Sequence, residues 1–334
     1  MWQTPSFWYE AKKPSDRLWP VLLTPLAFLY GWLARKRFDL YFPVPLARPV
    51  ICVGNLVAGG AGKTPVVLSL VGLLQDKGYN PHLLTRGYGG EEEGPLQVSP
   101  DRDTAEDVGD EALLLVEKAP TWVARSRPQG AQAAIDTGAS VIIMDDGFQN
   151  PSLYKDFVLL VVDGTSGFGN GKIFPAGPLR EPLAFGLSRA HAVLIIGEDK
   201  ADVARQVQEH TAVPVLSARL EACPDNPEIF SKTVYAFAGL GRPQKFKETL
   251  EAAGAIVEGW AEFPDHYPYA EEDLKELVAA AEAKNCPVIT TAKDYVRLPE
   301  TLRKKVLKFS VRLVWKDEEE VLRLALEALQ KRAP

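Results

Sequence analysis

The chain has 334 residues, of which 46% are hydrophobic, 25% charged and 9% aromatic, and its three cysteines and four histidines are scattered. This composition indicates a globular protein long enough for two lobes, and it excludes a disordered, collagenous, disulfide-scaffold or zinc-cluster protein. The formal net charge of -6 argues against nucleic acid as a partner.

The first predicted element is an N-terminal hydrophobic helix within residues 1–45. Residues 18–34, LWPVLLTPLAFLYGWLA, carry no charge, and their helical length of roughly 25 Å is shorter than the roughly 30 Å hydrocarbon core of a bilayer. Basic residues flank this run at Lys12, Lys13, Arg17, Arg35, Lys36 and Arg37. We therefore predict a helix at the interface of an anionic membrane. The alternative is a helix buried against the rest of the protein.

Residues 50–77 are typical of a phosphate-binding loop. An apolar run at 50–53 predicts a strand, GNLVAGGAGKT follows it, and residues 64–77 predict a helix. The residues expected around the phosphates of ATP are Gly59, Gly60, Ala61, Gly62, Lys63 and Thr64. In this context Lys63 reaches the β- and γ-phosphates and Thr64 offers its hydroxyl to Mg2+. The sequence departs from the common pattern at Val57, where glycine is usual.

Further apolar runs alternate with helical segments. The predicted strands are 82–85, 141–144, 157–163 and 192–196, and the predicted helices are 109–118, 128–138 and 200–210. This alternation predicts a mainly parallel sheet flanked by helices, with a P-loop NTPase-like fold. The strand at 141–144 leads into Asp145 and Asp146, which we expect to bind magnesium beside the phosphate loop.

A second, smaller α/β lobe is predicted after this sheet. Its expected strands are 233–238, 255–261 and 286–290, and its expected helices are 243–253, 270–284 and 317–332. We therefore divide the chain into an N-terminal membrane-interfacial helix at 1–45, a P-loop core at 46–225, which a kinase interpretation makes the kinase core, and a smaller C-terminal α/β lobe at 226–334.

Two classes of P-loop protein fit these features, a kinase and a membrane-associated switch ATPase. The switch ATPases carry a second lysine just before the two glycines, where this chain has Ala58. A kinase needs a base for the acceptor hydroxyl, and Asp110 and His266 are candidates. Asp110 opens a helical pattern, where a carboxylate alternatively only caps the helix. His266 lies in a loop bounded by prolines, where a histidine alternatively has no catalytic role.

Seven motifs in this order carry a family resemblance: GNLVAGGAGKTP, GDE, DDGFQ, PAGPLREP, AGLGRP, FPDHY and TTAKDYVRL. The chain resembles the tetraacyldisaccharide 4'-kinases of lipid A biosynthesis in Gram-negative bacteria. The resemblance implies transfer of the γ-phosphoryl group of ATP, with Mg2+, to the 4'-hydroxyl of an acylated glucosamine disaccharide 1-phosphate. It also implies a location at the cytoplasmic face of the inner membrane. We predict no obligate protein partner.

The resemblance also assigns roles to individual residues. It implies that Asp110 and His266 form a catalytic pair, with Lys63 acting on the phosphates. The implied magnesium ligands are Thr64, Asp145, Asp146 and Glu181, and the implied substrate-binding residues are Arg127, Asn150 and Arg180. Many family members have histidine where this chain has Asn150, so no imidazole is expected there.

Overall fold

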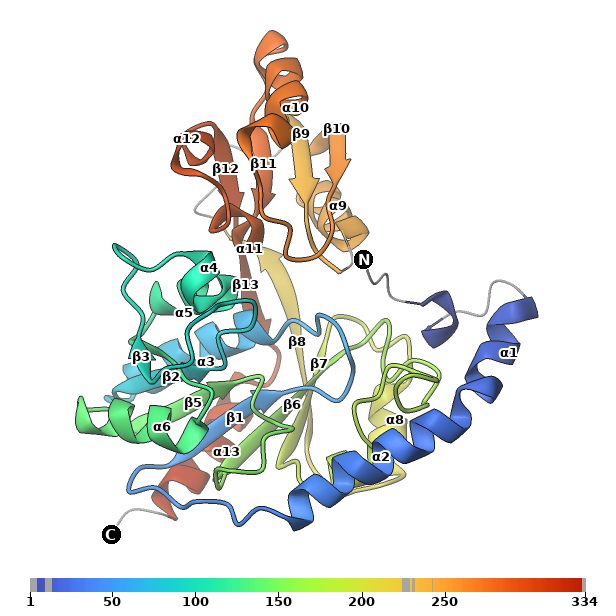
Figure 1. Ribbon diagram of the computed structural model, residues 1–334, viewed down its shortest axis with the longest axis vertical. Coiled ribbons are helices and arrows are strands. Elements are labelled where there is room, and N and C mark those ends of the chain that lie inside the picture. Colours follow the sequence, from blue (N-terminus) through green and yellow to red (C-terminus); the bar gives the residue numbers. More distant parts are fainter. Residues whose placement is uncertain (1–4, 10–13, 224–228, 230–231, 242, 332–334) are drawn as a thin grey trace.

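The structure is a computed structural model that describes residues 5–9, 14–223, 229, 232–241 and 243–331. Lys12 and Lys13, two of the basic residues that flank the apolar N-terminal run, lie outside the described residues. A larger lobe carries the N-terminal helices, and a smaller lobe lies above it in Figure 1.

The larger lobe is built on a nine-stranded sheet. Its strands are β1 (Val50–Gly54), β2 (Pro81–Thr85), β3 (Leu96–Gln97), β4 (Thr121–Val123), β5 (Val141–Asp145), β6 (Phe157–Asp163), β7 (Ala192–Ile196), β8 (Val215–Ala222) and β13 (Val311–Trp315). They lie in the order β13-β8-β7-β6-β1-β5-β2-β4-β3. Neighbours pair in parallel except at the two edges, where β13 is antiparallel to β8 and β3 to β4. The central strands are buried on both faces, which explains their continuous apolar runs.

Helices cover both faces of this sheet. One face packs against α3 (Lys63–Asp76), α5 (Asp110–Val116) and α13 (Glu318–Gln330). The other packs against α6 (Arg127–Asp136), α7 (Leu183–Leu187) and α8 (Val203–Gln208). The short helix α4 (Ala105–Val108) lies beside α5. The predicted parallel sheet flanked by helices is confirmed.

The smaller lobe has a four-stranded parallel sheet in the order β10-β9-β11-β12. Its strands are β9 (Thr233–Ala238), β10 (Ile256–Glu262), β11 (Val288–Thr291) and β12 (Val306–Phe309). Its helices are α9 (Pro243–Ala252), α10 (Glu271–Ala283), α11 (Ala292–Tyr295) and α12 (Glu300–Arg303). The apolar side of α9 packs on one face of the sheet, and those of α10 and α12 pack on the other. A smaller α/β lobe was thus predicted correctly.

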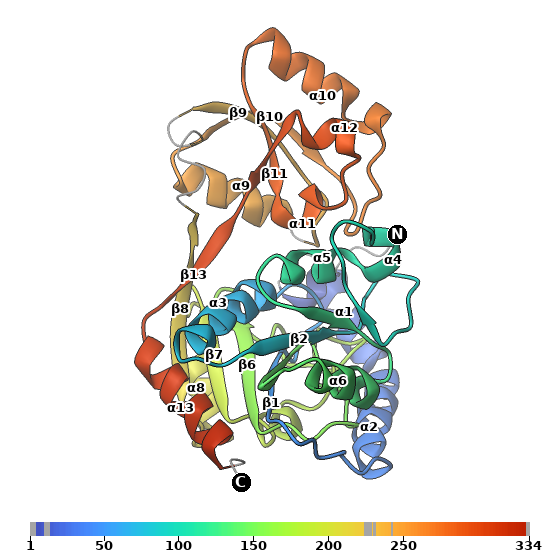
Figure 2. The same cartoon turned by 90° about the vertical axis from the view of Figure 1, so that its left-hand side faces the viewer.

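The end of the chain corrects the boundary predicted for this lobe. We expected residues 226–334 to form the smaller lobe, but β13 and α13 belong to the larger one. Strand β13 pairs with β8, and the apolar side of α13 (Val321, Ala325 and Leu329) is buried in the core of the nine-stranded sheet. Figure 2 shows β8 and β13 side by side between the lobes. The amphipathic pattern of α13 predicted a helix correctly, but it contains no information about which sheet the helix covers.

The N-terminal segment forms η1 (Ser6–Trp8), α1 (Pro14–Leu22) and α2 (Thr24–Asp39), and α2 lies along the larger lobe (Figure 1). Its buried positions are the small residues Ala27 and Gly31. A Cβ on Gly31 would lie 2.7 Å from Ile173, so glycine permits this close approach. Large apolar side chains of both helices face outward instead, with Leu22 of α1 66% exposed and Phe28 of α2 75% exposed. Most of the large apolar side chains of α2 are therefore not buried against the rest of the protein, which contradicts the alternative. Within the described residues, no helix has both the length and the apolar character to cross a bilayer.

Candidate active site

The sequence-predicted site residues gather around one cavity of about 920 Å³ at the junction of the two lobes. The larger lobe contributes the loop before α3, the end of β5 and the start of α5, and the smaller lobe contributes residues around α9 and α11. Predicted residues that line the cavity are Gly59, Gly60, Ala61, Gly62, Lys63, Thr64, Arg127, Asp145, Asp146, Asn150, Arg180 and His266. Asp110 and Glu181, the other two predicted residues, lie behind this lining and pair with other side chains.

The phosphate loop connects β1 to the N-terminus of α3, so it presents backbone amides and a helix dipole to the cavity. Gly62 precedes the helix with φ of +80°, and a Cβ there would also lie 2.9 Å from Ile196, which explains the glycine. Val57 does not have a positive φ, and it forms a β-bridge with Leu179. The first position of the common pattern therefore does not need glycine in this chain.

Two neighbouring aspartates at the end of β5 have opposite electrostatic properties. Asp145 is 2% exposed, and within the described part of the chain neither of its carboxylate oxygens has a hydrogen-bond partner. Burial, assisted by the charge of Glu111, raises the pKa of Asp145 to about 8. Burial also acts on Asp146, but the charges of Lys63 and Arg180 outweigh it and lower the pKa of that carboxyl. The nearest Asp146 oxygen lies 3.5 Å from Nζ of Lys63 and 3.0 Å from Nη1 of Arg180.

A hydrogen-bond network continues from Arg180 away from the cavity. Arg180 donates to Oε1 of Gln149 at 3.3 Å, and Gln149 donates to Oε1 of Glu181 at 3.1 Å. The other oxygen of Glu181 forms an ion pair with Arg189. Both carboxylate oxygens of Glu181 thus already have partners, and the residue is 1% exposed. Glu181 thus supports Gln149 and Arg180 in this structure, and its assignment to magnesium stays a prediction.

The predicted catalytic pair is brought together from the two lobes. Nδ1 of His266 lies 3.0 Å from Oδ2 of Asp110, which is buried at the start of α5. Burial acts to raise the pKa of Asp110, but the close contact with His266 and the charges of Lys293 and Arg297 outweigh burial and lower the pKa. The histidine has φ of +59°, a conformation that is uncommon outside glycine and frequent at functional sites. Its ring also contacts the ring of Tyr88, with centroids 5.3 Å apart.

Three charged residues at this pair had no role in the sequence prediction. Lys293 at α11 lies 3.3 Å from Glu111 and 3.5 Å from Nε2 of His266. Arg297 lies 3.4 Å from Asp110 and donates to the backbone oxygen of Tyr267, next to the histidine. Both cations belong to the TTAKDYVRL motif, and Glu111 belongs to the GDE motif. The motifs contained the signal, but without the fold they gave no indication of which side chains meet.

Two predicted substrate-binding residues lie on the larger-lobe side of the cavity. Arg127 is 4% exposed, and within the described residues its Nε has no hydrogen-bond partner. Burial, assisted by the charge of Arg86, lowers the pKa of its guanidinium to about 10. The side-chain oxygen of Asn150 accepts hydrogen bonds from Ser152 at 2.6 and 2.9 Å, so it is occupied locally.

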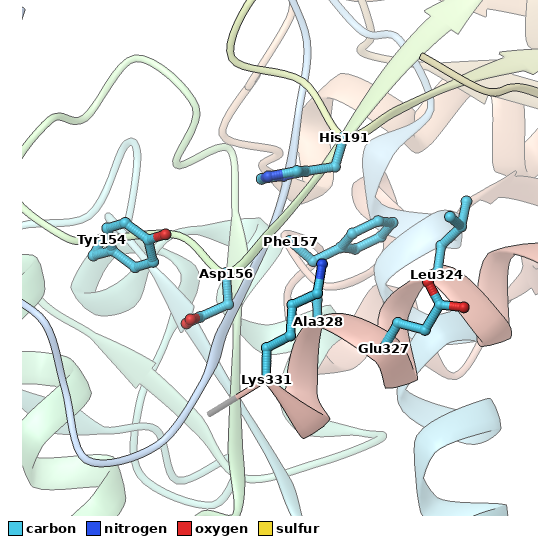
Figure 3. A pocket seen from close by; sticks show the side chains of 8 residues that line it. All are labelled: Tyr154, Asp156, Phe157, His191, Leu324, Glu327, Ala328 and Lys331. Atoms are coloured by element: carbon cyan, nitrogen blue, oxygen red, sulfur yellow. The ribbon is translucent and has the colours of Figure 1, made fainter. Parts of the chain in front are cut away.

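A second cavity, of about 470 Å³, lies at the opposite edge of the large sheet, where β6 and β7 begin (Figure 3). It is lined by Asp156 and His191 together with residues of α13. Both polar side chains serve the backbone, since Asp156 accepts from the amide of Val50 and His191 accepts from that of Val158. This cavity contains no predicted site residue.

Comparison with known proteins agrees with this geometry. Residues 19–330 match the family described as Tetraacyldisaccharide-1-P 4'-kinase. The chain is 50% identical to the tetraacyldisaccharide 4'-kinase of Paramagnetospirillum magneticum, with 94% of each chain covered. It is 49% identical to that of Rhodospirillum centenum, with 96% of this chain and 95% of the relative covered. A crystal structure of LpxK from Aquifex aeolicus in complex with ATP is similar, with 27% identity and a TM-score of 0.74, covering 93% of this chain and 99% of that one.

Proposed function

The chain belongs to the tetraacyldisaccharide-1-P 4'-kinase family, and from this premise we propose that it phosphorylates the 4'-hydroxyl of tetraacyldisaccharide 1-phosphate with ATP. One observation carries the proposal. The phosphate loop, the carboxylates of β5 and the paired Asp110 and His266 converge on one cavity between the lobes. A phosphoryl donor and a hydroxyl acceptor need these groups on their two sides.

On the donor side, the phosphate loop binds the phosphates of ATP, and Lys63 contacts the β- and γ-phosphates. We assign Mg2+ to Thr64, Asp145 and Asp146, because the buried Asp145 carboxylate lacks a hydrogen-bond partner among the described residues. A nearby cation favours the charged form of such a carboxyl group. When bound, Mg2+ neutralises charge on the β- and γ-phosphates.

On the acceptor side, Nε2 of His266 accepts the proton of the 4'-hydroxyl while Asp110 holds the ring through Nδ1. The hydroxyl oxygen then forms the bond to the γ-phosphorus. The bond from that phosphorus to the oxygen of the β-phosphate breaks, and ADP leaves with the electron pair. Positioning and charge stabilisation by Lys63 supply most of the acceleration, since phosphoryl transfer needs little covalent assistance from the protein.

We assign the binding of the acceptor disaccharide to Arg127, Asn150 and Arg180. Arg127 supports this assignment best, because a buried guanidinium with an unpaired Nε at a cavity wall favours an anionic ligand. Arg180 also lines the cavity, and its contact with Asp146 places its guanidinium next to the expected phosphate site.

We also propose that α1 and α2 lie on the cytoplasmic face of the anionic inner membrane. Their exposed face carries large apolar side chains such as Trp19, Phe28 and Trp32, and Lys36 and Arg37 lie in the last turn of α2. Arg37 also lines the active-site cavity. The path of an acylated substrate from the membrane to the site is therefore short.

The membrane assignment is tested by flotation with vesicles that contain anionic lipid. We expect the full chain to float with them and a variant with Leu22→Gln and Phe28→Gln, two of the most exposed apolar positions, to float much less. A matched pair of substitutions at exposed positions elsewhere, Tyr154→Gln and Ile256→Gln, is the control. Equal flotation of all three proteins contradicts the assignment.

The kinase function is tested with the full chain, Mg2+-ATP and the disaccharide 1-phosphate in detergent. We expect a lipid product heavier by one phosphate group. ATP hydrolysis stimulated by vesicles, without a phosphorylated lipid, would instead identify a membrane-associated switch ATPase.

The catalytic pair is tested by Asp110→Ala and His266→Ala. We expect each to lower kcat by about 10² to 10⁴, and the double variant to lose little more, because the two groups act as one unit. Single variants within a few-fold of the unsubstituted protein would remove the pair from the mechanism.

A further inference from the structure

The TTAKDYVRL segment, residues 290–298, contributes a rigid support at the edge of the active-site cavity. It covers the end of β11 and all of α11. Thr291 caps α11 by accepting from the amide of Asp294, which is fully buried. Asp294 in turn accepts from the hydroxyl of Tyr269 at 2.7 Å and from the amide of Gly239 at 2.9 Å. The backbone that carries Lys293 is therefore fixed on three sides.

From this support, Lys293 reaches the catalytic pair. Its Nζ lies 3.3 Å from Oε1 of Glu111, 3.9 Å from Oδ2 of Asp110 and 3.5 Å from Nε2 of His266. Burial acts to lower the pKa of this ammonium, but the charges of Glu111 and Asp110 outweigh burial and raise it. The side chain is therefore a cation whose charged end lies beside the ring nitrogen that faces away from Asp110.

The donors and acceptors at His266 define one arrangement of protons. An ammonium has three donors and no acceptor, so a hydrogen bond between Lys293 and Nε2 requires a lone pair on that nitrogen. Nδ1 lies 3.0 Å from Oδ2 of Asp110, and an ionised carboxylate can only accept, so this pairing favours a proton on Nδ1. This arrangement leaves the lone pair of the ring on Nε2, the nitrogen that must receive the proton of the acceptor hydroxyl.

We propose that Lys293 is a positioning residue of the transfer reaction, which holds His266 on Asp110 and keeps Nε2 ready to accept a proton. This inference rests on the proposed function, because that function makes His266 the proton acceptor. When the acceptor hydroxyl donates to Nε2, the ammonium of Lys293 keeps its contact with Glu111. Lys293 therefore fixes the orientation of the His266 ring before the substrate binds. It can stay in the site, on Glu111, while the substrate is bound.

The charges around His266 predict what the loss of Lys293 would do. The groups that face the ring are Asp110 and Tyr88 from the larger lobe and Asp265 and Lys293 from the smaller lobe, with Glu111 and Arg297 adjacent to them. Without Lys293 the ring faces two carboxylates and no ammonium, so it retains a second proton to higher pH. Arg297 still contacts Asp110, so that buried carboxylate does not become unpaired.

The first experiment measures kcat against pH, from about pH 6 to about pH 9, for the full chain and three variants. Lys293→Met removes the charge, Lys293→Arg keeps it, and Lys305→Met removes a charge that pairs with Glu282 on the surface of the same lobe. For Lys293→Met we expect kcat near neutral pH to fall by about 10- to 100-fold and the acid limb to move up by about one pH unit or more. We expect Lys293→Arg to stay within about tenfold of the unsubstituted protein, with its acid limb unmoved, and Lys305→Met to match that protein.

Two kinetic outcomes overturn the proposal. One is a Lys293→Met variant with unchanged kcat and an unmoved acid limb. The other is a higher KM for the lipid with an unmoved acid limb, which would make Lys293 a substrate-binding residue instead.

The second experiment needs no turnover, so it separates this proposal from the proposed function. It records the ¹⁵N signals of the imidazole groups in the ligand-free full chain and identifies those of His266 by their loss in His266→Ala. We expect the proton on Nδ1 and the lone pair on Nε2 in the unsubstituted protein, and a larger doubly protonated fraction in Lys293→Met at the same pH. A proton on Nε2 in the unsubstituted protein overturns the proposal, even if Lys293→Met does not fold.

Discussion

At the scale of single residues, the site contains adjacent carboxylates with opposite roles. Asp145 ends a buried strand and has no hydrogen-bond partner among the described residues, whereas Asp146 contacts both Lys63 and Arg180. Burial therefore dominates the pKa of Asp145 and raises it. At Asp146 the neighbouring cations dominate and lower the pKa. A divalent cation suits this pair of carboxylates, because it would neutralise the charge of Asp145, for which the protein itself supplies no partner among the described residues.

The first prediction concerns Asp145→Asn in the absence of Mg2+. Since the pKa of Asp145 is raised to about 8 in the folded protein, the folded state keeps a proton that the unfolded chain loses above about pH 4. The free energy of unfolding of the unsubstituted protein therefore falls between these pH values, and the variant escapes this loss. We expect Asp145→Asn to be more stable by at least about 1 kcal/mol above pH 8 and to show little advantage near pH 4. Urea denaturation at several pH values measures the difference.

The matched control is Asp146→Asn, whose pH dependence has the opposite sign. The pKa of Asp146 is lowered in the folded protein, so its contribution to stability is present above the pKa of the unfolded chain. That contribution is lost as the pH falls through the folded pKa. We therefore expect Asp146→Asn to destabilise the protein at neutral pH and less in acid. The same slope for both variants contradicts the assigned electrostatics.

The residues that line the cavity were largely predictable, but their contacts were not. The glycine loop and the aspartates after an apolar strand are local patterns, and each appears where the sequence predicts it. Glu181 was assigned to magnesium because its motif resembles the family, yet its partner Arg189 is brought to it only by folding. Lys293 shows the converse, since no pattern within its own segment indicates that His266 will lie 3.5 Å away.

At the scale of secondary structure, the predicted elements were those with enough length or periodicity to be unambiguous. The strands β1, β5, β6 and β7 are continuous apolar runs, and α3, α10 and α13 have clear helical patterns. The missed strands β3 and β4 have only two and three residues, and they depend on pairing with neighbours that the sequence does not identify. The missed strands β8, β12 and β13 are longer, but β8 and β13 pair with each other across about a hundred residues, and the sequence does not identify such distant partners.

The attachment of α2 to the larger lobe shows how one element can be held by a side chain of another. The guanidinium of Arg189 lies over the rings of Phe38 in α2, Phe185 in α7 and Phe148, at 4.0, 4.5 and 4.2 Å from their centroids. The same guanidinium forms the ion pair with the buried Glu181. Arg189 therefore joins the N-terminal helix to the hydrogen-bond network that ends at Asp146.

The second prediction separates these two contacts. Arg189→Met leaves the carboxylate of Glu181 buried without its cation, which we expect to cost about 3 to 5 kcal/mol of stability. Adding Glu181→Gln should recover part of this loss, because a neutral amide costs less to bury than a carboxylate.

Phe38→Ala tests the contact with α2. It should lower global stability less than Arg189→Met does, but it should increase hydrogen exchange in residues 24–39, since it removes a contact of α2 with Arg189 and Phe185. Unchanged exchange in that segment would show that α2 is held elsewhere.

At the scale of the whole molecule, the ion pairs between the lobes, among the described residues, place the basic side chain on the smaller lobe and the carboxylate on the larger lobe. In each pair a side chain of the smaller lobe contacts a carboxylate of the larger lobe: Lys245 with Asp163, Lys293 with Glu111, Lys308 with Glu117, and His266 with Asp110. Six of these eight residues line the active-site cavity, and Asp110 and Asp163 lie behind them. An apolar cluster, in which Val296 and Ala292 pack against α5, adds to these ion pairs. The charged contacts are the part of the interface that bound nucleotide and Mg2+ can alter.

The covalent connection between the lobes shows that the smaller lobe is an insertion in the larger one. The chain leaves the large sheet through β8 and returns through β13, and Ala222 and Val311 are paired residues of these two strands. The amide of Cys223 also donates to the oxygen of Ser310 at 2.9 Å. Trp315 at the far end of β13 donates to Ser69 in α3, the helix that follows the phosphate loop. The larger lobe therefore needs residues from both sides of the insertion.

The third prediction follows from this topology. A variant in which a short glycine-containing turn replaces residues 224–309 keeps β8, β13 and α13, and we expect it to fold and to bind ATP without phosphorylating the lipid.

The fragment 1–225 should not fold, because it exposes the side of the core that β13 and α13 cover. Each large buried side chain there contributes about 1.5 to 3 kcal/mol. A loss of that size over Leu313, Trp315, Val321 and Leu329 is comparable with the 5 to 15 kcal/mol that stabilises a typical domain. Circular dichroism, urea denaturation and equilibrium dialysis with ATP distinguish the two proteins. A folded, ATP-binding 1–225 fragment would contradict this topology, since the linear division of the chain predicts that outcome and the insertion excludes it.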